Sequence, residues 1–198
     1  MSTGRRLTPR GEERRAQLIA YSTTLFATKG YHSSSVADIV DGVGVGKGVF
    51  YWYFSSKEQL FVEILREAQK DMRRRQQREI TDVEDPVERL ARGIRAAVMW
   101  SAEHRDLFQL FEFALTDDTF SQAMRTGRST LANDAVEHLK SAIAEGRIPD
   151  RDPEQLAYAI LGVSSLLTME YVHHRNETPE SVAEMVVDFC LGGIGARP

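Results

Sequence analysis

The residues with the clearest chemical potential lie between positions 44 and 54, which read GVGKGVFYWYF. Three glycines surround Lys47, and an aromatic run begins at Phe50 directly after them. Glycines around a lysine are typical of loops that bind nucleotide phosphates through backbone N–H groups. Exposed lysine and tyrosine side chains also bind the phosphates of a nucleic-acid backbone. The stretch therefore indicates phosphate chemistry of one of these two kinds.

The spacing of the glycines argues against a nucleotide site. A P-loop has a glycine five residues before its Gly-Lys pair and a serine or threonine directly after it. Asp41 and Gly48 occupy those positions here. A dinucleotide fingerprint of the form GxGxxG fails as well, because Val49 or Tyr51 stands where the third glycine belongs, and no strand pattern precedes it.

The same stretch fits a helix-turn-helix, which needs two short helices and apolar residues at set offsets. We expect the first helix, of about eight residues, to begin at Ser35, with Asp38 completing a capping box. Gly44 takes the turn, where a left-handed backbone favours glycine. The second helix covers about residues 47–53. The side chains expected to face inward are Ile39, Val43, Val45, Phe50, Tyr53 and Phe54.

The opposite face of the second short helix carries Lys47, Gly48, Tyr51 and Trp52. A helix this short does not expose two large aromatic side chains without a reason. A DNA surface supplies one, because a tyrosine hydroxyl can bond a phosphate and small residues let the helix enter the major groove. The pattern therefore favours DNA as the phosphate ligand.

Helical periodicity dominates the rest of the chain, and alternating strand patterns are absent. The first helix is expected from about residue 12 to 29, and a long helix follows Ser55 or Ser56. The polar residues 71–85 indicate a helix end and a connection, after which Asp85-Pro86 begins the next helix. We predict an all-α protein of about nine helices, the later ones at 86–104, 106–115, 118–145, 152–174 and 179–193.

Composition and charge support a globular chain with one basic part. The chain has 198 residues, of which 42% are hydrophobic, and a net charge of −4. Eight lysines and arginines against four acidic residues give residues 1–57 a net charge of +4, so the remainder carries −8. A basic part on an acidic body predicts a polyanionic partner for the first part. The apolar runs are short for a membrane helix, and one cysteine without a signal peptide predicts a cytoplasmic protein.

Residues 18–65 resemble the DNA-binding region of TetR-family transcriptional repressors. The matching segments are LFATKGY, SSSVADIV and GVGKGVFYWYFSSKEQL. The resemblance implies a flexible arm at 1–9, a helix-turn-helix domain at 10–57, and a ligand-binding and dimerisation domain at 58–198. It further implies a homodimeric repressor that binds a palindromic double-stranded DNA operator and is released by a small effector.

The resemblance also implies roles for single residues. Ser34, Ser35, Tyr51 and Lys57 match positions that bind backbone phosphates in the family. Two positions depart from the family pattern, since Gly46 and Val49 stand where serine or threonine is usual. The DNA-binding residues predicted in this way are Ser34, Ser35, Gly46, Lys47, Gly48, Val49, Tyr51, Trp52 and Lys57.

The last two expected helices predict a dimer interface. The helix at 152–174 is apolar nearly all round, and such a helix in a thin helical domain must be covered by a partner. The helix at 179–193 carries a matching apolar stripe. Two copies of this pair form a four-helix interface, for which the candidate residues are Leu156, Ile160, Val163, Leu167, Val182, Val186 and Phe189.

Aromatic and methionine side chains in the middle of the chain suit an apolar effector pocket, although each also suits plain core packing. The candidates are Met99, Trp100, Phe108, Phe111, Phe113, Met124 and Met169. No catalytic constellation, cofactor fingerprint or metal-ligand spacing stands out, so neither an enzyme, a cofactor nor a metal site is expected. The alternative is a DNA-binding regulator without a small effector, controlled by a protein partner or by concentration.

Two groups of arginines keep two interpretations each. Arg5, Arg6, Arg10, Arg14 and Arg15 form either an arm that reaches DNA or a solvated tail. Arg73, Arg74, Arg75 and Arg78 fit a solvated helix face better than a phosphate contact.

Overall fold

The computed structural model describes residues 7–196 and is helical throughout, without strands in that range. The prediction of an all-α chain with about nine helices is confirmed for these residues. In chain order the elements are α1 (Pro9–Lys29), α2 (Val36–Val43), α3 (Lys47–Tyr53), α4 (Lys57–Ile80), α5 (Pro86–Glu103), α6 (Arg105–Thr116), the 3₁₀ turn η1 (Asp118–Phe120), α7 (Ser121–Ala144), α8 (Pro153–Leu167), the π-helix η2 (Thr168–His174) and α9 (Pro179–Ile194).

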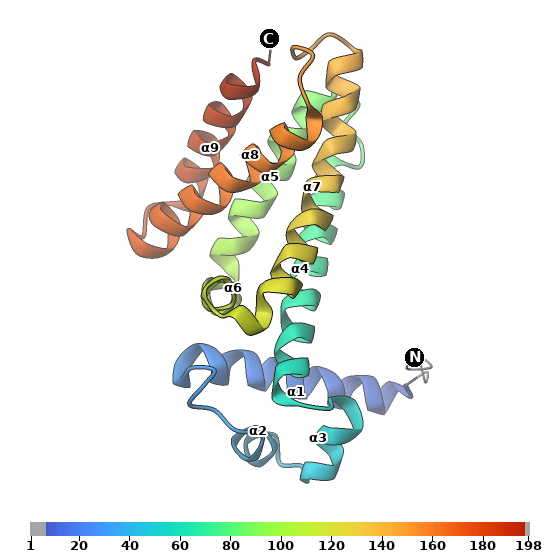
Figure 1. Cartoon of the computed structure of the whole chain (residues 1–198), viewed down its shortest axis with the longest axis vertical. Helices are drawn as coiled ribbons and strands as arrows, with labels where there is room; N and C mark the ends of the chain where they lie inside the picture. The colour runs from blue at the N-terminus through green and yellow to red at the C-terminus, as the bar shows by residue number, and fades with distance from the viewer. Residues whose placement is uncertain (1–6, 197–198) are drawn as a thin grey trace.

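The helices form two groups joined by α4 (Figure 1). Helices α1, α2 and α3 lie together at one end of the molecule, and α4 runs from them along the long axis. Helices α5, α7, α8 and α9 make up the other end, and α6 lies between the two groups. The helix-turn-helix therefore stands apart from the helices expected to dimerise.

The local signals at the N-terminal end are present as predicted, with one exception. Ser35 and Asp38 form a reciprocal capping box at α2, and Gly44 ends that helix in the left-handed conformation, at φ 72°. Helix α1 begins earlier than the apolar pattern indicates, because Thr8 caps it and Pro9 occupies its first turn. Two residues of the expected arm thus belong to the cap and first turn of α1. Residues 1–6 of the arm lie outside the described residues.

Helix α4 is longer than predicted. Residues 71–80, expected to hold a helix end and a connection, continue the helix to Ile80. Their arginines do not form a purely solvated face, because two of the four pair with acids on neighbouring helices. Arg73 makes two hydrogen bonds with Asp134 of α7, and Arg75 lies 3.5 Å from Glu103 of α5. The last turns of α4 have few apolar side chains, and ion pairs attach them to α5 and α7.

Two hydrophobic clusters fill the interior, and their border does not follow the predicted border between domains. One cluster joins α5, α7, α8 and α9. The other contains the buried side chains of α1 to α3 and the start of α4, together with Leu110 and Ala114 of α6 and Phe120 of η1. Helix α6 therefore shares a core with α1, α2 and α3, the end of the molecule that is expected to bind DNA and is called the DNA-binding end below.

The helix expected at 152–174 changes type along its length. It is α-helical as α8 and widens to a π-helix in η2. Contrary to the expectation from run length, Pro153–His174 is long and apolar enough to cross a membrane on length and composition alone. Single helices of this kind also occur as interface and core helices of globular proteins.

Candidate DNA-binding site

Helix α3, the second helix of the helix-turn-helix, packs against the core through buried aromatic side chains at Phe50 and Phe54. Phe50 and Phe54 are buried, and their rings lie 5.8 Å apart. Ile39 of α2 is fully buried in the same cluster, and Val45 in the turn is half-buried against it. These contacts fix the rotation of a seven-residue helix that has no side-chain cap at Gly46. The rotation determines which side chains α3 presents outward.

The outward face of α3 matches the sequence prediction. Tyr51 and Trp52 are 55% and 54% exposed, and Lys47, Gly48 and Val49 are also exposed. A Cβ atom added at Gly48 would have nothing within 4 Å, so the backbone there is open. The backbone at Gly48 carries no side chain, and the exposed Lys47 and Tyr51 lie near it, so this part of α3 can approach a DNA groove closely. The structure thus brings five of the predicted DNA-binding residues onto one face.

Two predicted phosphate ligands have different roles in the structure. Ser34 is only 3% exposed, and its hydroxyl donates to the carbonyl oxygen of Gly30 at 2.7 Å. The side chain therefore closes the loop between α1 and α2, and the prediction of a Ser34 phosphate contact is wrong for the side chain. Ser35 remains exposed at the start of α2, but its hydroxyl is engaged with Asp38.

Lys57 is likewise used inside the protein. Its Nζ donates to the carbonyl oxygens of Tyr31 and Ser34, each at 2.8 Å, and lies 4.1 Å from the centre of the Tyr31 ring. Sequence reasoning missed this role because the carbonyls belong to a loop more than twenty residues earlier. The ammonium group joins α4 to the α1–α2 loop, which leaves little of it for a phosphate.

Tyr31 is the centre of the junction between the DNA-binding end and the body. Its buried ring lies within 5.5 Å of four phenylalanine rings, centre to centre, those of Phe26, Phe61, Phe113 and Phe120. Its hydroxyl donates to Glu58 at 3.1 Å. Burial, reinforced by the Glu58 carboxylate, raises the pKa of Tyr31 far above its usual value. The hydroxyl therefore stays protonated and keeps donating.

A second contact crosses the same junction. His32, in the loop after α1, has its Nε2 3.2 Å from a carboxylate oxygen of Asp117, which caps η1. Hydrogen bonds from Thr119, with the nearby His32, lower the pKa of Asp117, so this carboxylate is charged at neutral pH. The loop that precedes the helix-turn-helix is thus in direct contact with the end of α6.

The predicted effector residues do not form one group. Phe111, Phe113 and Met124 pack against the cluster of the DNA-binding end. Trp100 is buried, and its Nε1 donates to Asp71 of α4 at 2.8 Å. The remaining candidates, Met99, Phe108 and Met169, are half-buried. Three of the seven candidates thus pack in the cluster of the DNA-binding end and four do not, and the effector pocket stays a prediction.

Phe108 lies beside a buried polar pair that sequence reasoning missed. Its ring stacks on His173 at 3.8 Å, and His173 Nε2 is 2.9 Å from the hydroxyl of Ser101. Burial, together with the nearby Arg105 and His174, lowers the pKa of His173 to about 4. The imidazole is therefore neutral at physiological pH. The sequence gives little signal for this pair, because Ser101 and His173 are 72 residues apart.

The predicted dimer residues divide between the core and the surface. Val182 and Val186 are buried in their own subunit, so their assignment to an interface is wrong. Ile160 is also buried, and Leu156, Val163 and Leu167 are half-buried against the same core. Phe189 is 63% exposed. The exposed apolar side chains on the outer side of α8 and α9 are Tyr158, Leu166, Met185 and Phe189.

Two family models match the chain along both halves of this fold. The one described as "Bacterial regulatory proteins, tetR family" matches residues 18–64, and the one described as "Tetracyclin repressor-like, C-terminal domain" matches residues 83–194. The chain belongs to the TetR family. Members of this family are DNA-binding transcriptional regulators, some of them named repressors, and the resemblance read from residues 18–65 is confirmed.

Relatives and solved structures of the TetR family agree over most of the chain. The HTH-type transcriptional repressor KstR2 of Mycolicibacterium smegmatis is 27% identical over 187 residues, which cover 91% of this chain and 90% of KstR2. A TetR-family regulator from Syntrophomonas wolfei superposes with a TM-score of 0.84 at 24% identity, covering 93% of this chain and 96% of that one. FadR from Bacillus subtilis, solved in complex with stearoyl-CoA, superposes with a TM-score of 0.82 at 22% identity, covering 90% of this chain and 98% of FadR.

Proposed function

We propose that this TetR-family regulator is a cytoplasmic repressor that binds a palindromic operator as a homodimer. The observation that carries the proposal is the outward face of α3, where Tyr51 and Trp52 are more than half exposed on a helix that Phe50 anchors from behind. Two large aromatic side chains beside Lys47 form a surface suited to a DNA groove and its phosphates. Each subunit contributes one recognition helix to one half-site.

The outer side of α8 and α9 supports the homodimer. Leu166 and Phe189 are 57% and 63% exposed, and Tyr158 and Met185 are also exposed. Cβ atoms added at Gly162, Gly192 or Gly193 would meet nothing within 4 Å, so the helix backbones are accessible there. An exposed apolar face of this kind needs a partner surface. A second copy covers it by two-fold symmetry and accounts for the apolar length of α8 without a membrane.

Release by a small, largely apolar effector completes the proposal. Support comes from the shared core of α6 and the DNA-binding end, because a ligand that displaces α6 would also displace Phe113 and its contact with Tyr31. Such a ligand favours one arrangement of the two recognition helices over the other. The neighbour FadR was solved with stearoyl-CoA, so acyl-CoA thioesters are the first class to test; their acyl chain supplies the apolar part, and their CoA part is anionic.

Selection of bound duplexes from a random DNA pool tests the DNA-binding part. We expect an inverted repeat whose half-sites are about one helical turn or slightly more apart. A recovered pool without a repeated half-site would argue against symmetric binding by two subunits.

Anisotropy of a labelled, selected duplex tests the effector part. An acyl-CoA that acts as effector lowers operator affinity and, by linkage, binds less tightly to the DNA-bound protein. If an acyl-CoA stabilises the protein against heat but leaves operator affinity unchanged, effector release by that class fails and control by a partner or by concentration is favoured.

A further inference from the structure

Arg10 and Arg14 lie on a groove between the start of α1 and the recognition helix. The groove has a volume of about 460 Å³ and is lined on one side by residues of α1 and its cap and on the other by residues of α3. The lining residues are Thr8, Arg10, Gly11, Arg14, Gly48, Val49, Trp52 and Tyr53. Three of them, Gly48, Val49 and Trp52, belong to the outward face of α3, so the groove opens beside the proposed DNA-binding surface.

The two helices are in close contact at the base of this groove. A Cβ atom at Gly11 would stand 3.5 Å from the hydroxyl of Tyr53. The indole of Trp52 lies edge-on to the Tyr53 ring, with 4.5 Å between ring centres. Because Arg10 and Arg14 are four residues apart on α1, they lie on the same side of that helix. The start of α1 therefore extends the outward face of α3 with two cations.

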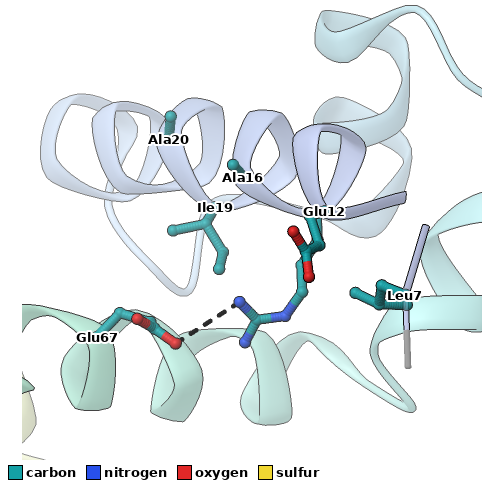
Figure 2. A pocket seen from close by; sticks show the side chains of 7 residues that line it. Leu7, Glu12, Ala16, Ile19, Ala20 and Glu67 are labelled. Carbon is teal, nitrogen blue, oxygen red and sulfur yellow. Dashed lines mark ion pairs between the residues drawn. The ribbon is translucent and has the colours of Figure 1, made fainter. Parts of the chain in front are cut away.

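The arginines of α1 face two different neighbours, since Arg10 and Arg14 line the groove beside α3 and Arg15 faces α4. Within residues 7–196, neither Arg10 nor Arg14 has an ion-pair partner, and no acidic residue lines their groove. Arg15 faces α4 instead, where its Nη2 is 3.0 Å from Glu63 and its Nη1 3.7 Å from Glu67. Arg15 lies in a second pocket, between α1 and α4, which is also lined by Glu12 and Glu67 (Figure 2). The dashed line in Figure 2 marks the ion pair of Glu67 with Arg15.

We propose that the groove binds the sugar–phosphate backbone of the same DNA whose major groove α3 enters. Arg10 and Arg14 pair with phosphates, and Trp52 packs its indole against a deoxyribose. The inference rests on the proposed DNA-binding function. It adds residues that precede the match to the family model of the DNA-binding region, which begins at residue 18. Of the five N-terminal arginines, Arg10 and Arg14 are thereby assigned to DNA and Arg15 to the fold, and Arg5 and Arg6 lie outside the described residues.

DNA is the occupant that the charge and position favour. The groove is continuous with the face of α3, its two charged side chains are both cations, and residues 1–57 carry a net positive charge. Half or more of the hydrogen bonds in protein–DNA complexes go to phosphate and sugar, which gives such a flank a large share of the affinity. An acidic protein segment would meet the same cations, and the test below separates it from DNA.

Salt dependence of DNA binding tests the proposal directly. The probe is a labelled duplex of about 30 base pairs, selected with the wild-type protein and long enough for two half-sites. Each phosphate contact contributes about 0.9 to the slope of log affinity against log salt concentration. The double substitution Arg10→Ala and Arg14→Ala should therefore lower the slope by about two for each bound subunit. Alanine preserves helix propensity, so α1 should remain folded.

Arg15→Ala is the control, because it removes one positive charge from the same helix on its α4-facing side, half of what the double substitution removes. It should leave the slope unchanged while lowering the midpoint of thermal unfolding. A wild-type slope in the Arg10→Ala, Arg14→Ala protein would overturn the proposal and leave an acidic partner as the occupant. A fall in the Arg15→Ala protein of half that size, which is the same fall per charge removed, would also overturn it, since the effect would then be one of net charge.

Trp52 provides a second readout that does not depend on affinity. The chain has two tryptophans, so Trp100→Phe leaves Trp52 as the single fluorophore. Backbone seated in the groove should shield Trp52 from acrylamide quenching at saturating duplex. Unchanged quenching would contradict the groove contact. If the wild-type protein binds no duplex at all, the proposed function itself fails; if it binds but the arginine variants match it, the groove assignment alone fails.

Discussion

Side chains around the recognition helix divide into those that hold the fold and those that are free to bind. Ser34 and Lys57 donate to loop carbonyls, and Phe50 is buried behind α3. The hydroxyl of Tyr51, in contrast, makes no hydrogen bond within residues 7–196, although its ring packs on Phe50 at 5.3 Å. Folding therefore positions this hydroxyl without using it, which leaves it for a phosphate.

Tyr51→Phe should weaken binding to every duplex by a similar factor, about fivefold per bound subunit for the loss of one hydrogen bond worth roughly 1 kcal/mol. Fluorescence anisotropy with the selected and a scrambled duplex measures this. Thermal unfolding should not change, because the hydroxyl has no partner within residues 7–196. Tyr171→Phe removes a hydroxyl in η2, remote from α3, and serves as the control. A loss confined to one base-pair position would assign Tyr51 to base recognition instead.

At the scale of elements, Gly48 in α3 is a residue whose type suits close approach to DNA better than it suits helix stability. Gly48 lies inside this helix with open space around it, and a glycine inside a helix lowers stability by about 0.5–1 kcal/mol relative to alanine. A stronger helix was thus available by a single substitution. The bare backbone instead allows the helix to approach another surface closely.

Gly48→Ala should raise the free energy of unfolding by about 0.5–1 kcal/mol and at the same time lower operator affinity. Urea unfolding and anisotropy measure the two effects separately. Gly44→Ala is the comparison, since Gly44 has φ 72° with nothing within 4 Å of a Cβ, so its loss of stability comes from the backbone. Unaltered operator affinity in Gly48→Ala would show that α3 does not approach DNA through this residue.

Helices α4 and α5 are joined by the hydrogen bond from Trp100 to Asp71, which has a pH signature. The hydrogen bond from Trp100, with help from Arg74, lowers the pKa of Asp71. The folded state therefore favours the charged carboxylate. Its contribution to stability is complete above the unfolded pKa of about 3.9 and is lost as the pH falls through the lower folded value.

Trp100→Phe should therefore cost more stability at pH 7 than at a pH below the lowered pKa that Asp71 has in the folded state, where the carboxyl group is protonated. Urea unfolding of both proteins between these pH values gives the difference. The packing lost with the indole remains as a part that does not depend on pH. In an Asp71→Asn background the cost of Trp100→Phe should be constant over this range. A cost in the wild-type background that is equally constant would contradict the role of the hydrogen bond.

Element positions were predictable where the signals are local, and less so where they are not. The capping box at Ser35, the turn at Gly44 and the Asp85-Pro86 start follow from neighbouring residues, and each is present. The extent of α4 was not predictable, because Arg73 pairs with Asp134, sixty-one residues later. The role of Lys57 was missed for the same reason, since its acceptors lie in an earlier loop.

For the whole molecule, the register of the last helix decides which face is free. Val182, Val186 and Cys190 repeat every four residues and face the core, whereas Met185 and Phe189 repeat on the outer side. The sequence predicts a single apolar stripe that contains all of these residues, and only the packing against α5 shows which of them the subunit itself covers. The fold was therefore predictable from the sequence, but the residues of the interface were predictable only in part.

Phe189→Glu should convert the proposed dimer to a folded monomer and lower operator affinity by at least tenfold, because a buried unpaired charge costs several kcal/mol. Light scattering and circular dichroism measure assembly and folding. Leu115→Glu is the matched control, since Leu115 is 51% exposed on α6, away from α8 and α9. A Phe189→Glu protein that remains dimeric would place the interface elsewhere.

The central claim is that two copies of α3 read one DNA site, and the most direct measurement is an equilibrium titration of the selected duplex and a scrambled duplex at physiological salt. The account predicts two chains per selected duplex and an affinity about a thousandfold or more above that for the scrambled one. Equal affinity for both duplexes, or saturation at one chain per selected duplex, would contradict it.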